Sequence, residues 1–235
     1  MSFKPLLFDM LDSLCNDNIK IYESKNKDFT EKFSTNKLLN QIDPILQLEP
    51  KIICNVDGIN GLYYIPKYLT NNELTMLKDK IESDEIKLEP ISSSKNSRCV
   101  AHFGYFYSYD HTGLKPADPI PNYLKNLALA NRINQFSGHP VVNNEFDQVI
   151  INEYEPGQQI SYHTDHTKLF GPIIACITVG EAVPIKFKLD DIEKKINVEE
   201  GSMYIMTGDA RYKWQHSLRN NTKNNRYSIT YRTIR

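Results

Sequence analysis

The sequence predicts an α+β protein whose core is a β-sandwich or jelly roll. From residue 148 onwards, short segments of β type follow one another, separated by turns such as Glu155-Pro156-Gly157-Gln158. The segments with helical periodicity come before this region instead of alternating with it, which argues against repeated βα units. With 235 residues, 40% of them hydrophobic, the chain is long enough to bury one sizeable core.

Residues 1–55 are expected to form an N-terminal extension, and residues 56–235 the main domain. Within the extension, the apolar pattern of Pro5–Cys15 is compatible with a short helix. Asn18–Asn40 is polar and rich in lysine, which fits a loop, a weak helix or a disordered link.

The sequence from Gly61 to Ile133 predicts two helices and two strands. Thr70 and Glu73 have the spacing of a capping box, which predicts a helix over residues 71–83. The remaining predictions are strands at Leu62–Ile65 and Cys99–Tyr109 and a second helix at Asn122–Ile133.

Eight further strands are predicted between residue 148 and the C-terminus. They are Gln148–Tyr154, Gln159–His163, Ile173–Val179, Ile185–Leu189, Lys195–Val198, Met203–Met206, Trp214–Leu218 and Arg226–Arg232.

The composition restricts the partners and the compartment. A net charge of −1 excludes a global polyanion-binding surface but leaves room for a local basic groove. The four cysteines show no C-x-x-C spacing, so reduced thiols are expected. No signal peptide or apolar run of about 18 residues occurs, and we expect an intracellular monomer, cytoplasmic or nuclear, without a membrane partner.

His163 and Asp165 form an H-x-D pair that can place two metal ligands on one face of a strand, because side chains at i and i+2 point the same way. His216 is a candidate third ligand, and His166 is left out because it would point to the opposite face. Taken singly, each of these residues is better explained as an ordinary surface or hydrogen-bonded histidine or a turn aspartate. Together, two histidines and one carboxylate leave metal positions open, which suits non-haem Fe(II) oxygenases better than structural zinc.

The last predicted strand alternates between a polar and an apolar face. Arg226, Ser228, Thr230 and Arg232 share one face, and Tyr227, Ile229 and Tyr231 share the other. One interpretation is an edge strand with a solvated polar face. The other is a polar face that lines the interior, where two arginines would bind a dicarboxylate cosubstrate through bidentate contacts.

Several motifs together resemble the AlkB-type 2-oxoglutarate/Fe(II)-dependent dioxygenases. The similarity extends over roughly residues 61–235, and within the family it is greatest to the dioxygenase domain of the tRNA-modifying homologue. The motifs are Asn152-x-Tyr154, Glu155-Pro156-Gly157-Gln158, His163-x-Asp165, Phe170-Gly171-Pro172, Gly201–Met206, Gly208–Tyr212, Trp214-x-His216 and Arg226–Arg232, together with His102-Phe103-Gly104-Tyr105.

This resemblance implies a double-stranded β-helix core with N-terminal helices and a nucleotide-recognition lid. It implies that His163, Asp165 and His216 bind Fe(II) and form the catalytic centre. It also implies that Asn152, Tyr154, Arg226, Ser228 and Arg232 bind 2-oxoglutarate. The expected reaction uses dioxygen, converts 2-oxoglutarate to succinate and CO2, and demethylates or hydroxylates a modified base.

Substrate contacts are expected from Tyr105, Tyr107 and Arg98. Phe103, Tyr105, Tyr107 and Tyr109 alternate along one strand, and such a stripe stacks on unpaired bases or packs in a core; the resemblance assigns the segment to the lid. A set of basic residues can form a rim that contacts phosphates or simply a solvated charged surface: Lys95, Arg98, Lys186, Lys188, Arg211 and Lys213. The expected partner is modified single-stranded DNA or RNA, possibly tRNA. The alternatives are a dioxygenase that acts on a protein or small molecule, and an inactive nucleic-acid-binding module, which the complete ligand set argues against.

Overall fold

The computed structural model of the chain describes residues 51–94, 97–109, 113–137 and 140–235. The helix expected at Pro5–Cys15 and nearly all of the N-terminal extension lie outside these residues. No helix in the described part of the chain is long and apolar enough to cross a membrane.

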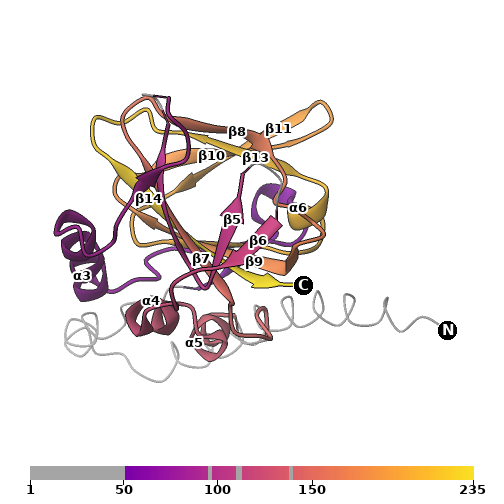
Figure 1. Cartoon of the computed structure of the whole chain (residues 1–235). Helices are drawn as coiled ribbons and strands as arrows, with labels where there is room; N and C mark the ends of the chain where they lie inside the picture. Colours follow the sequence, from indigo (N-terminus) through magenta and orange to yellow (C-terminus); the bar gives the residue numbers. More distant parts are fainter. Residues whose placement is uncertain (1–50, 95–96, 110–112, 138–139) are drawn as a thin grey trace, which may run out of the picture. The chain divides into compact units, whose positions relative to one another are not determined.

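Two antiparallel sheets face each other, and a two-stranded hairpin lies beside them (Figure 1). The eight-stranded sheet has the order β1 (Ile53–Cys54), β2 (Leu62–Ile65), β12 (Met203–Met206), β9 (Phe170–Val179), β14 (Arg226–Ile234), β7 (Gln148–Tyr154), β4 (Cys99–Phe103) and β3 (Glu89–Pro90). The four-stranded sheet has the order β11 (Ile192–Val198), β10 (Val183–Leu189), β13 (Gln215–Arg219) and β8 (Gln159–His163). The hairpin consists of β5 (Tyr105–Ser108) and β6 (Gly113–Pro116). The predicted jelly roll is therefore confirmed.

The helices are few and short. They are η1 (Val56–Gly58, a 3-10 helix), α3 (Asn71–Glu82), α4 (Asn122–Leu127), α5 (Ala130–Gln135) and α6 (Gly208–Tyr212). The predicted start of α3 is confirmed: the Thr70 side chain accepts from the backbone N–H of Glu73, and the Glu73 carboxylate accepts from the backbone N–H of Thr70.

The strand predicted over Cys99–Tyr109 is wrong as one unit, because the chain breaks at Gly104 into β4 and β5, which belong to different sheets. Gly104 has a φ of 75°, and a Cβ atom there would lie 1.9 Å from the carbonyl oxygen of Asp147. Only glycine fits this close approach without strain. The predicted aromatic stripe is divided at the same point, since Phe103 packs against the core beneath the large sheet.

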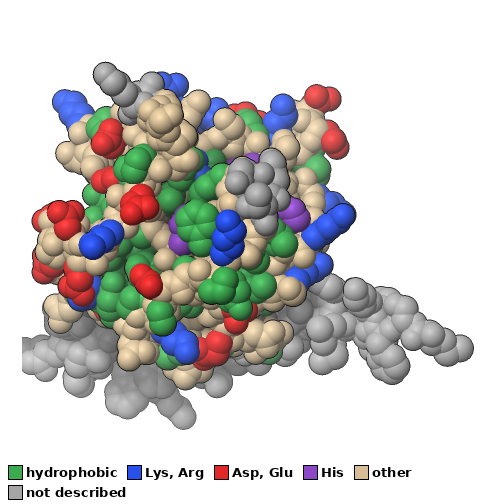
Figure 2. Space-filling view, viewed as in Figure 1, with side chains coloured by type: hydrophobic (Ala, Val, Ile, Leu, Met, Phe, Trp, Pro, Cys, Tyr) green, Lys and Arg blue, Asp and Glu red, His purple; other side chains and the backbone are tan. Residues whose placement is uncertain are grey.

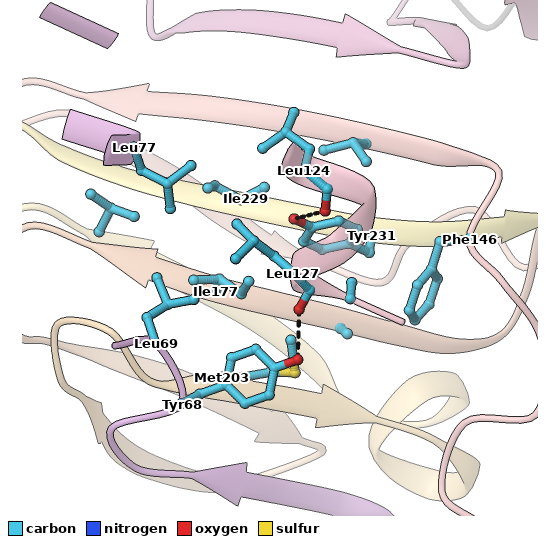
Figure 3. Packing of buried hydrophobic residues seen from close by; sticks show 14 of the residues in the cluster. Tyr68, Leu69, Leu77, Leu124, Leu127, Phe146, Ile177, Met203, Ile229 and Tyr231 are labelled. Atoms are coloured by element: carbon cyan, nitrogen blue, oxygen red, sulfur yellow. Dashed lines mark hydrogen bonds between the residues drawn. The ribbon is translucent and has the colours of Figure 1, made fainter. Parts of the chain in front are cut away.

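The helix predicted over Asn122–Ile133 is also wrong as one unit. It breaks between α4 and α5, where Ala128 has φ −129° and ψ 29° and Leu129 is extended. The break gives α4 its own C-terminal end, whose carbonyls need hydrogen-bond donors. The Tyr68 hydroxyl donates to Leu127 O at 2.6 Å, and the Tyr231 hydroxyl donates to Leu124 O at 3.0 Å (Figure 3).

The first hydrophobic core lies between these helices and one face of the large sheet. Leu77 of α3 and Leu124 of α4 pack with Ile177 of β9 and Ile229 of β14, all of them fully buried (Figure 3). The apolar face predicted for the last strand therefore points to the helices, which leaves its arginine-bearing face for the space between the sheets.

The second core fills part of the space between the two sheets. Phe187 of β10 and Leu218 of β13 meet Cys176 of β9 and Tyr204 of β12 there. Strand alternation explains the division, since neighbouring residues of β9 and β12 belong to the first core. Most of the polar side chains that face the space between the sheets lie in the remaining part.

Candidate active site

A cavity of about 500 Å³ lies between the two sheets and opens to solvent. All site residues predicted from the sequence line this cavity, with the exception of Tyr105. The lining residues from this set are Arg98, Tyr107, Asn152, Tyr154, His163, Asp165, His216, Arg226, Ser228 and Arg232.

Three potential metal ligands converge at one side of the cavity. His163 and His216 are cross-strand partners in the β8–β13 ladder, and their ring centroids lie 4.2 Å apart. Nε2 of His216 lies 3.6 Å from Oδ2 of Asp165. Each of the three residues has one potential ligand atom, and these three atoms lie within 4.8 Å of one another. These distances fit a single metal ion.

The orientation of the ligands is fixed by neighbouring groups. Nδ1 of His163 lies 2.9 Å from Ser161 O, so a proton on Nδ1 is bonded to this carbonyl and Nε2 is left for a metal. Asp165 accepts from Nε of Arg232 at 2.8 Å and lies 2.5 Å from Nη2 of the same side chain. A carboxylate held by one arginine keeps its second oxygen available as a ligand.

The protonation states also suit metal binding. Burial, together with the adjacent His163 ring, lowers the pKa of the His216 imidazole to about 3 despite the nearby Asp165 carboxylate. Burial alone would raise the pKa of the Asp165 carboxyl, but Arg232 and the two histidines hold its pKa well below the usual range. At neutral pH the site therefore presents a neutral imidazole and a carboxylate, which are the forms that bind metals.

Arg226 lies at the other end of the cavity and has no anionic partner in the described structure. Its side chain is 0% exposed, and its one hydrogen bond is from Nη2 to Oγ1 of Thr178, at 3.2 Å. Nε and Nη1 are buried without a hydrogen-bond partner among the described residues. Burial lowers the pKa of this guanidinium, yet arginine keeps its charge in proteins.

A buried and unpaired guanidinium is costly, and a bound carboxylate removes the cost. Arg226 thus fits the distal carboxylate of a dicarboxylic acid whose other end reaches the metal ligands. The Fe(II) and 2-oxoglutarate pair requires such an arrangement: an open metal triad at one end and a cation at the other.

The mouth of the cavity is aromatic and basic. Tyr107 packs on Phe170 with ring centroids 5.5 Å apart and on Tyr109 at 5.2 Å. Arg98 lies 5.6 Å from the Tyr109 ring centroid, and its Nε donates to Oδ1 of Asn152 at 3.2 Å. Flat aromatic surfaces beside a guanidinium suit a planar, electron-rich ligand such as a nucleobase.

Tyr105 lies outside the cavity, on the same hairpin. It is 36% exposed, and its carbonyl accepts from Nε2 of Gln148 at 2.9 Å. Its neighbour Phe106 is 41% exposed and packs on the His102 ring, with centroids 4.5 Å apart. Figure 2 looks onto this hairpin and shows hydrophobic, histidine and basic side chains gathered over it.

Arg211 was a candidate for a phosphate-contacting rim or a solvated surface, and the structure contradicts both interpretations. It is 1% exposed, and it donates to the carbonyls of Asp165 at 2.9 Å, His166 at 3.4 Å and Gly171 at 3.3 Å. Arg211 lies on α6 (Gly208–Tyr212), a short helix that was not predicted from the sequence. Arg211 therefore holds the loop that carries Asp165 and does not face solvent.

Sequence reasoning missed two residues that contact the arginines of the cavity. Thr178 is the hydrogen-bond partner of Arg226, and Phe170 lies 4.9 Å from the Arg232 guanidinium. The signal for Thr178 was the alternation of Ile173–Val179, which turns a polar side chain towards the same face as Cys176. Of the remaining rim lysines, Lys213 pairs with Asp209 at 3.0 Å, and Lys95 lies outside the described residues.

Comparisons with known proteins agree with this geometry. The model of the 2OG-Fe(II) oxygenase superfamily matches residues 61–232. The "tRNA (carboxymethyluridine(34)-5-O)-methyltransferase ALKBH8" of Macaca fascicularis is 26% identical over 160 residues, which cover 67% of this chain and 24% of that protein. The "Uncharacterized protein L905" of Acanthamoeba polyphaga mimivirus is 27% identical over 192 residues, which cover 75% of this chain and 86% of that protein.

A likeness in structure extends the comparison to the fold. The solved structure of OsALKBH1 superposes with a TM-score of 0.56 at 14% sequence identity, covering 74% of this chain and 96% of that chain. At this identity the likeness shows the fold alone. The chain spans about a quarter of the length of the macaque relative, so that relative's activity as a whole protein does not transfer with the similarity.

Proposed function

Since the chain belongs to the 2OG-Fe(II) oxygenase superfamily, and is thus a dioxygenase that uses Fe(II) and 2-oxoglutarate, we propose that it oxidises modified bases in nucleic acid. The resemblance to AlkB-type dioxygenases is supported by the sequence similarity to the macaque ALKBH8 protein. The proposed outcome is demethylation of an N-methyl group or hydroxylation of a carbon, in RNA, tRNA or single-stranded DNA.

We assign the metal to His163, Asp165 and His216, because their ligand atoms lie within 4.8 Å of one another inside the cavity. This set of two imidazoles and one carboxylate leaves open positions for a bidentate cosubstrate and dioxygen. When bound, Fe(II) and 2-oxoglutarate supply the oxidation of a substrate C–H bond by dioxygen, with release of succinate and CO2.

The protein's own residues bind and orient these reactants. Arg226, buried and unpaired, is proposed to bind the distal carboxylate of 2-oxoglutarate together with Thr178. Arg232 holds Asp165 in place as a ligand. Asn152, Tyr154 and Ser228 line the cavity between the two ends and are proposed to contact the bound cosubstrate.

The aromatic mouth is the observation that favours a base as the substrate. Tyr107 and Tyr109 are half-buried there, with Arg98 over the Tyr109 ring, and the buried Phe170 packs against Tyr107. A base that enters such a site must come from a single strand or be flipped out of a duplex. The hairpin β5–β6, which carries Tyr105 and Tyr107, is proposed to act as the nucleotide-recognition lid.

The name of the macaque relative refers to carboxymethyluridine at position 34 of tRNA. Modified uridine in tRNA is therefore the first base to test on this chain, followed by N-methylated adenine and cytosine. Each base should be offered in tRNA, in unstructured RNA and in single-stranded DNA.

The test is to incubate the purified chain with Fe(II), 2-oxoglutarate and this panel, and to measure succinate together with the mass of each nucleoside after digestion. We expect succinate to rise in step with the conversion of at least one modified nucleoside, and expect neither product from the His216→Ala variant. The same assay with methylated peptides and small metabolites serves as the competing arm. Turnover confined to that arm would replace this proposal with a protein or small-molecule dioxygenase.

A further inference from the structure

The four-stranded sheet has an outer surface, turned away from the cavity, that carries an excess of positive charge. Phe187 of β10 and His216 of β13 turn inward, so strand alternation turns Lys186, Lys188 and Arg219 outward. The register places Lys195 of β11 beside Lys186 on the same outward surface. We call Lys186, Lys188, Lys195 and Arg219 the basic face.

Acidic charge is scarce on this surface. Among the outward-turned residues of β10, β11 and β13, all of which are described, Glu193 is the one acidic residue against four basic ones. The whole chain has a net charge of −1, so this distribution is a local concentration of positive charge. Figure 2 shows acidic side chains gathered over α3, with a few more at the end of the β10–β11 hairpin.

Two lysines of the basic face lie directly opposite each other on neighbouring strands, an arrangement that lowers the stability of the folded chain. Lys186 and Lys195 are direct cross-strand partners, and like charges in such positions destabilise a sheet. Their Nζ atoms share one oxygen, Oε1 of Glu193, at 3.4 Å and 3.9 Å. The other oxygen of Glu193 accepts from the Tyr162 hydroxyl at 2.7 Å. One carboxylate cannot neutralise two ammonium groups, so the pair attracts a further anion.

The basic face lies close to the entrance of the cavity. Tyr162 of the edge strand β8 extends over the outer surface as far as Glu193 on β11, and Lys188 lies 6.0 Å from its ring centroid. The next residue, His163, belongs to the candidate metal site inside. Gln159 and Ser161, also on β8, are exposed and line the cavity. A flexible chain that leaves the cavity over β8 therefore reaches the basic face directly.

We propose that the basic face binds the phosphodiester backbone of the strand whose base enters the cavity. This inference rests on the proposed function, since it takes nucleic acid as the partner. Lysine ammonium groups act as point charges that attract phosphates without reading sequence. The basic face thus supplies affinity and positions the strand, while the cavity selects the base.

The test compares single-stranded oligonucleotide binding by fluorescence anisotropy over a range of NaCl concentrations. The variant is K186Q/K188Q/K195Q, and the matched control is K67Q/K87Q/K125Q, which removes the same charge from exposed lysines elsewhere. Loss of three phosphate contacts should lower the slope of log Kd against log salt by about 2 and weaken binding about tenfold at low salt. The control should keep the wild-type slope.

A third variant separates charge from folding: K186R/K188R/K195R retains the positive charges and should keep the wild-type slope. Equal slopes for the glutamine variant and its control would overturn the basic face as a binding surface while leaving the proposed function standing. Failure of the wild-type chain to bind any oligonucleotide would overturn both. Anionic lipid vesicles form the last arm: loss of vesicle binding in the glutamine variant, with oligonucleotide binding unchanged, would also overturn the proposal.

Discussion

His163 and His216 face each other across the β8–β13 ladder, with ring centroids 4.2 Å apart. His163 is the last residue of β8, and His216 lies on β13. Backbone pairing between two neighbouring strands therefore sets their separation, and the loop after β8 needs only to return Asp165 to the same point. A site built on strands in this way is more rigid than one assembled from loops. The two histidines of the metal triad are thus part of the sheet itself.

Arg226 is the residue whose role is easiest to isolate. Arg226→Met removes the buried guanidinium, and we expect 2-oxoglutarate to bind at least about 30-fold more weakly, which corresponds to about 2 kcal/mol for a buried charge pair. Calorimetric titration of 2-oxoglutarate onto the Mn(II)-loaded protein measures this change.

The same variant makes a second prediction that guards against simple misfolding. Because Nε and Nη1 of Arg226 have no partner in the described structure, the variant should be at least as stable as the wild type when no cosubstrate is present. Mn(II) affinity should also stay unchanged. Marked destabilisation in urea would show that Arg226 has a structural role instead.

Arg211 is expected to act on the metal site through the backbone. Arg211→Met removes a donor from the buried carbonyls of Asp165 and Gly171, and from that of His166, which keeps the backbone N–H of Phe170. We expect a loss of about 2–4 kcal/mol in the free energy of unfolding, together with weaker metal binding. Urea unfolding and Mn(II) titration measure the two effects.

Lys213 offers a control for Arg211, because it lies two residues away but pairs with Asp209 at the surface. Lys213→Met should change stability by less than about 0.5 kcal/mol and leave Mn(II) affinity as it is. If Arg211→Met bound Mn(II) as tightly as this control, Arg211 would stabilise the fold without any effect on the metal site.

Gly104 and Gly113 allow the same substitution to be compared at two places in the β5–β6 hairpin. Gly104 immediately precedes β5, and Gly113 is the first residue of β6. Both have positive φ, but a Cβ at Gly104 would lie 1.9 Å from Asp147 O, whereas nothing lies within 4 Å of one at Gly113. We expect Gly104→Ala to cost about 3 kcal/mol or more and Gly113→Ala about 1 kcal/mol. Thermal unfolding of the two variants checks the order; equal effects would mean that the backbone at Gly104 shifts easily.

Glu73 gives the chain a pH-dependent contribution to stability. Hydrogen bonds from Arg132, acting against partial burial, lower the pKa of its carboxyl to about 2. A depressed pKa contributes stability above the ordinary carboxyl pKa, and this contribution is lost as the pH falls through the window from about 4.5 to about 2. Glu73→Gln should therefore be less stable than the wild type at pH 7, by about 1 kcal/mol after allowance for solvent screening, with a difference that shrinks in acid.

The control for this prediction is Glu85→Gln, since the Glu85 carboxylate pairs with Lys80 but is 56% exposed. Urea unfolding at a series of pH values compares the two variants. A constant difference between wild type and Glu73→Gln from pH 7 down to pH 3 would contradict the pH dependence.

The sequence was sufficient for features that repeat locally. Alternation of polar and apolar residues placed Arg226 and Arg232 on one face, and the structure turns that face into the cavity. The spacing of Thr70 and Glu73 located the start of α3. Both patterns express a period that the backbone imposes, so they survive in the folded protein.

What the sequence could not supply depends on contacts between distant segments. The break at Gly104 depends on the close approach of the Asp147 carbonyl. The break before Leu129 could not be predicted, because residues 122–133 contain no glycine or proline. Arg211 looked like a surface residue because its partners are backbone carbonyls 40 to 46 residues away. Contacts with backbone carbonyls so distant in sequence cannot be predicted from the local pattern of residues.

The most direct test of the metal triad and of Arg226 is a crystal structure of the chain with Mn(II) and 2-oxoglutarate. The metal is located in it from its anomalous scattering. We expect one ion bound by Nε2 of His163, a carboxylate oxygen of Asp165 and Nε2 of His216, with the distal carboxylate of 2-oxoglutarate on Arg226. An ion found elsewhere, an ion enclosed by four protein ligands with no open position, or a cosubstrate that avoids Arg226 would contradict it.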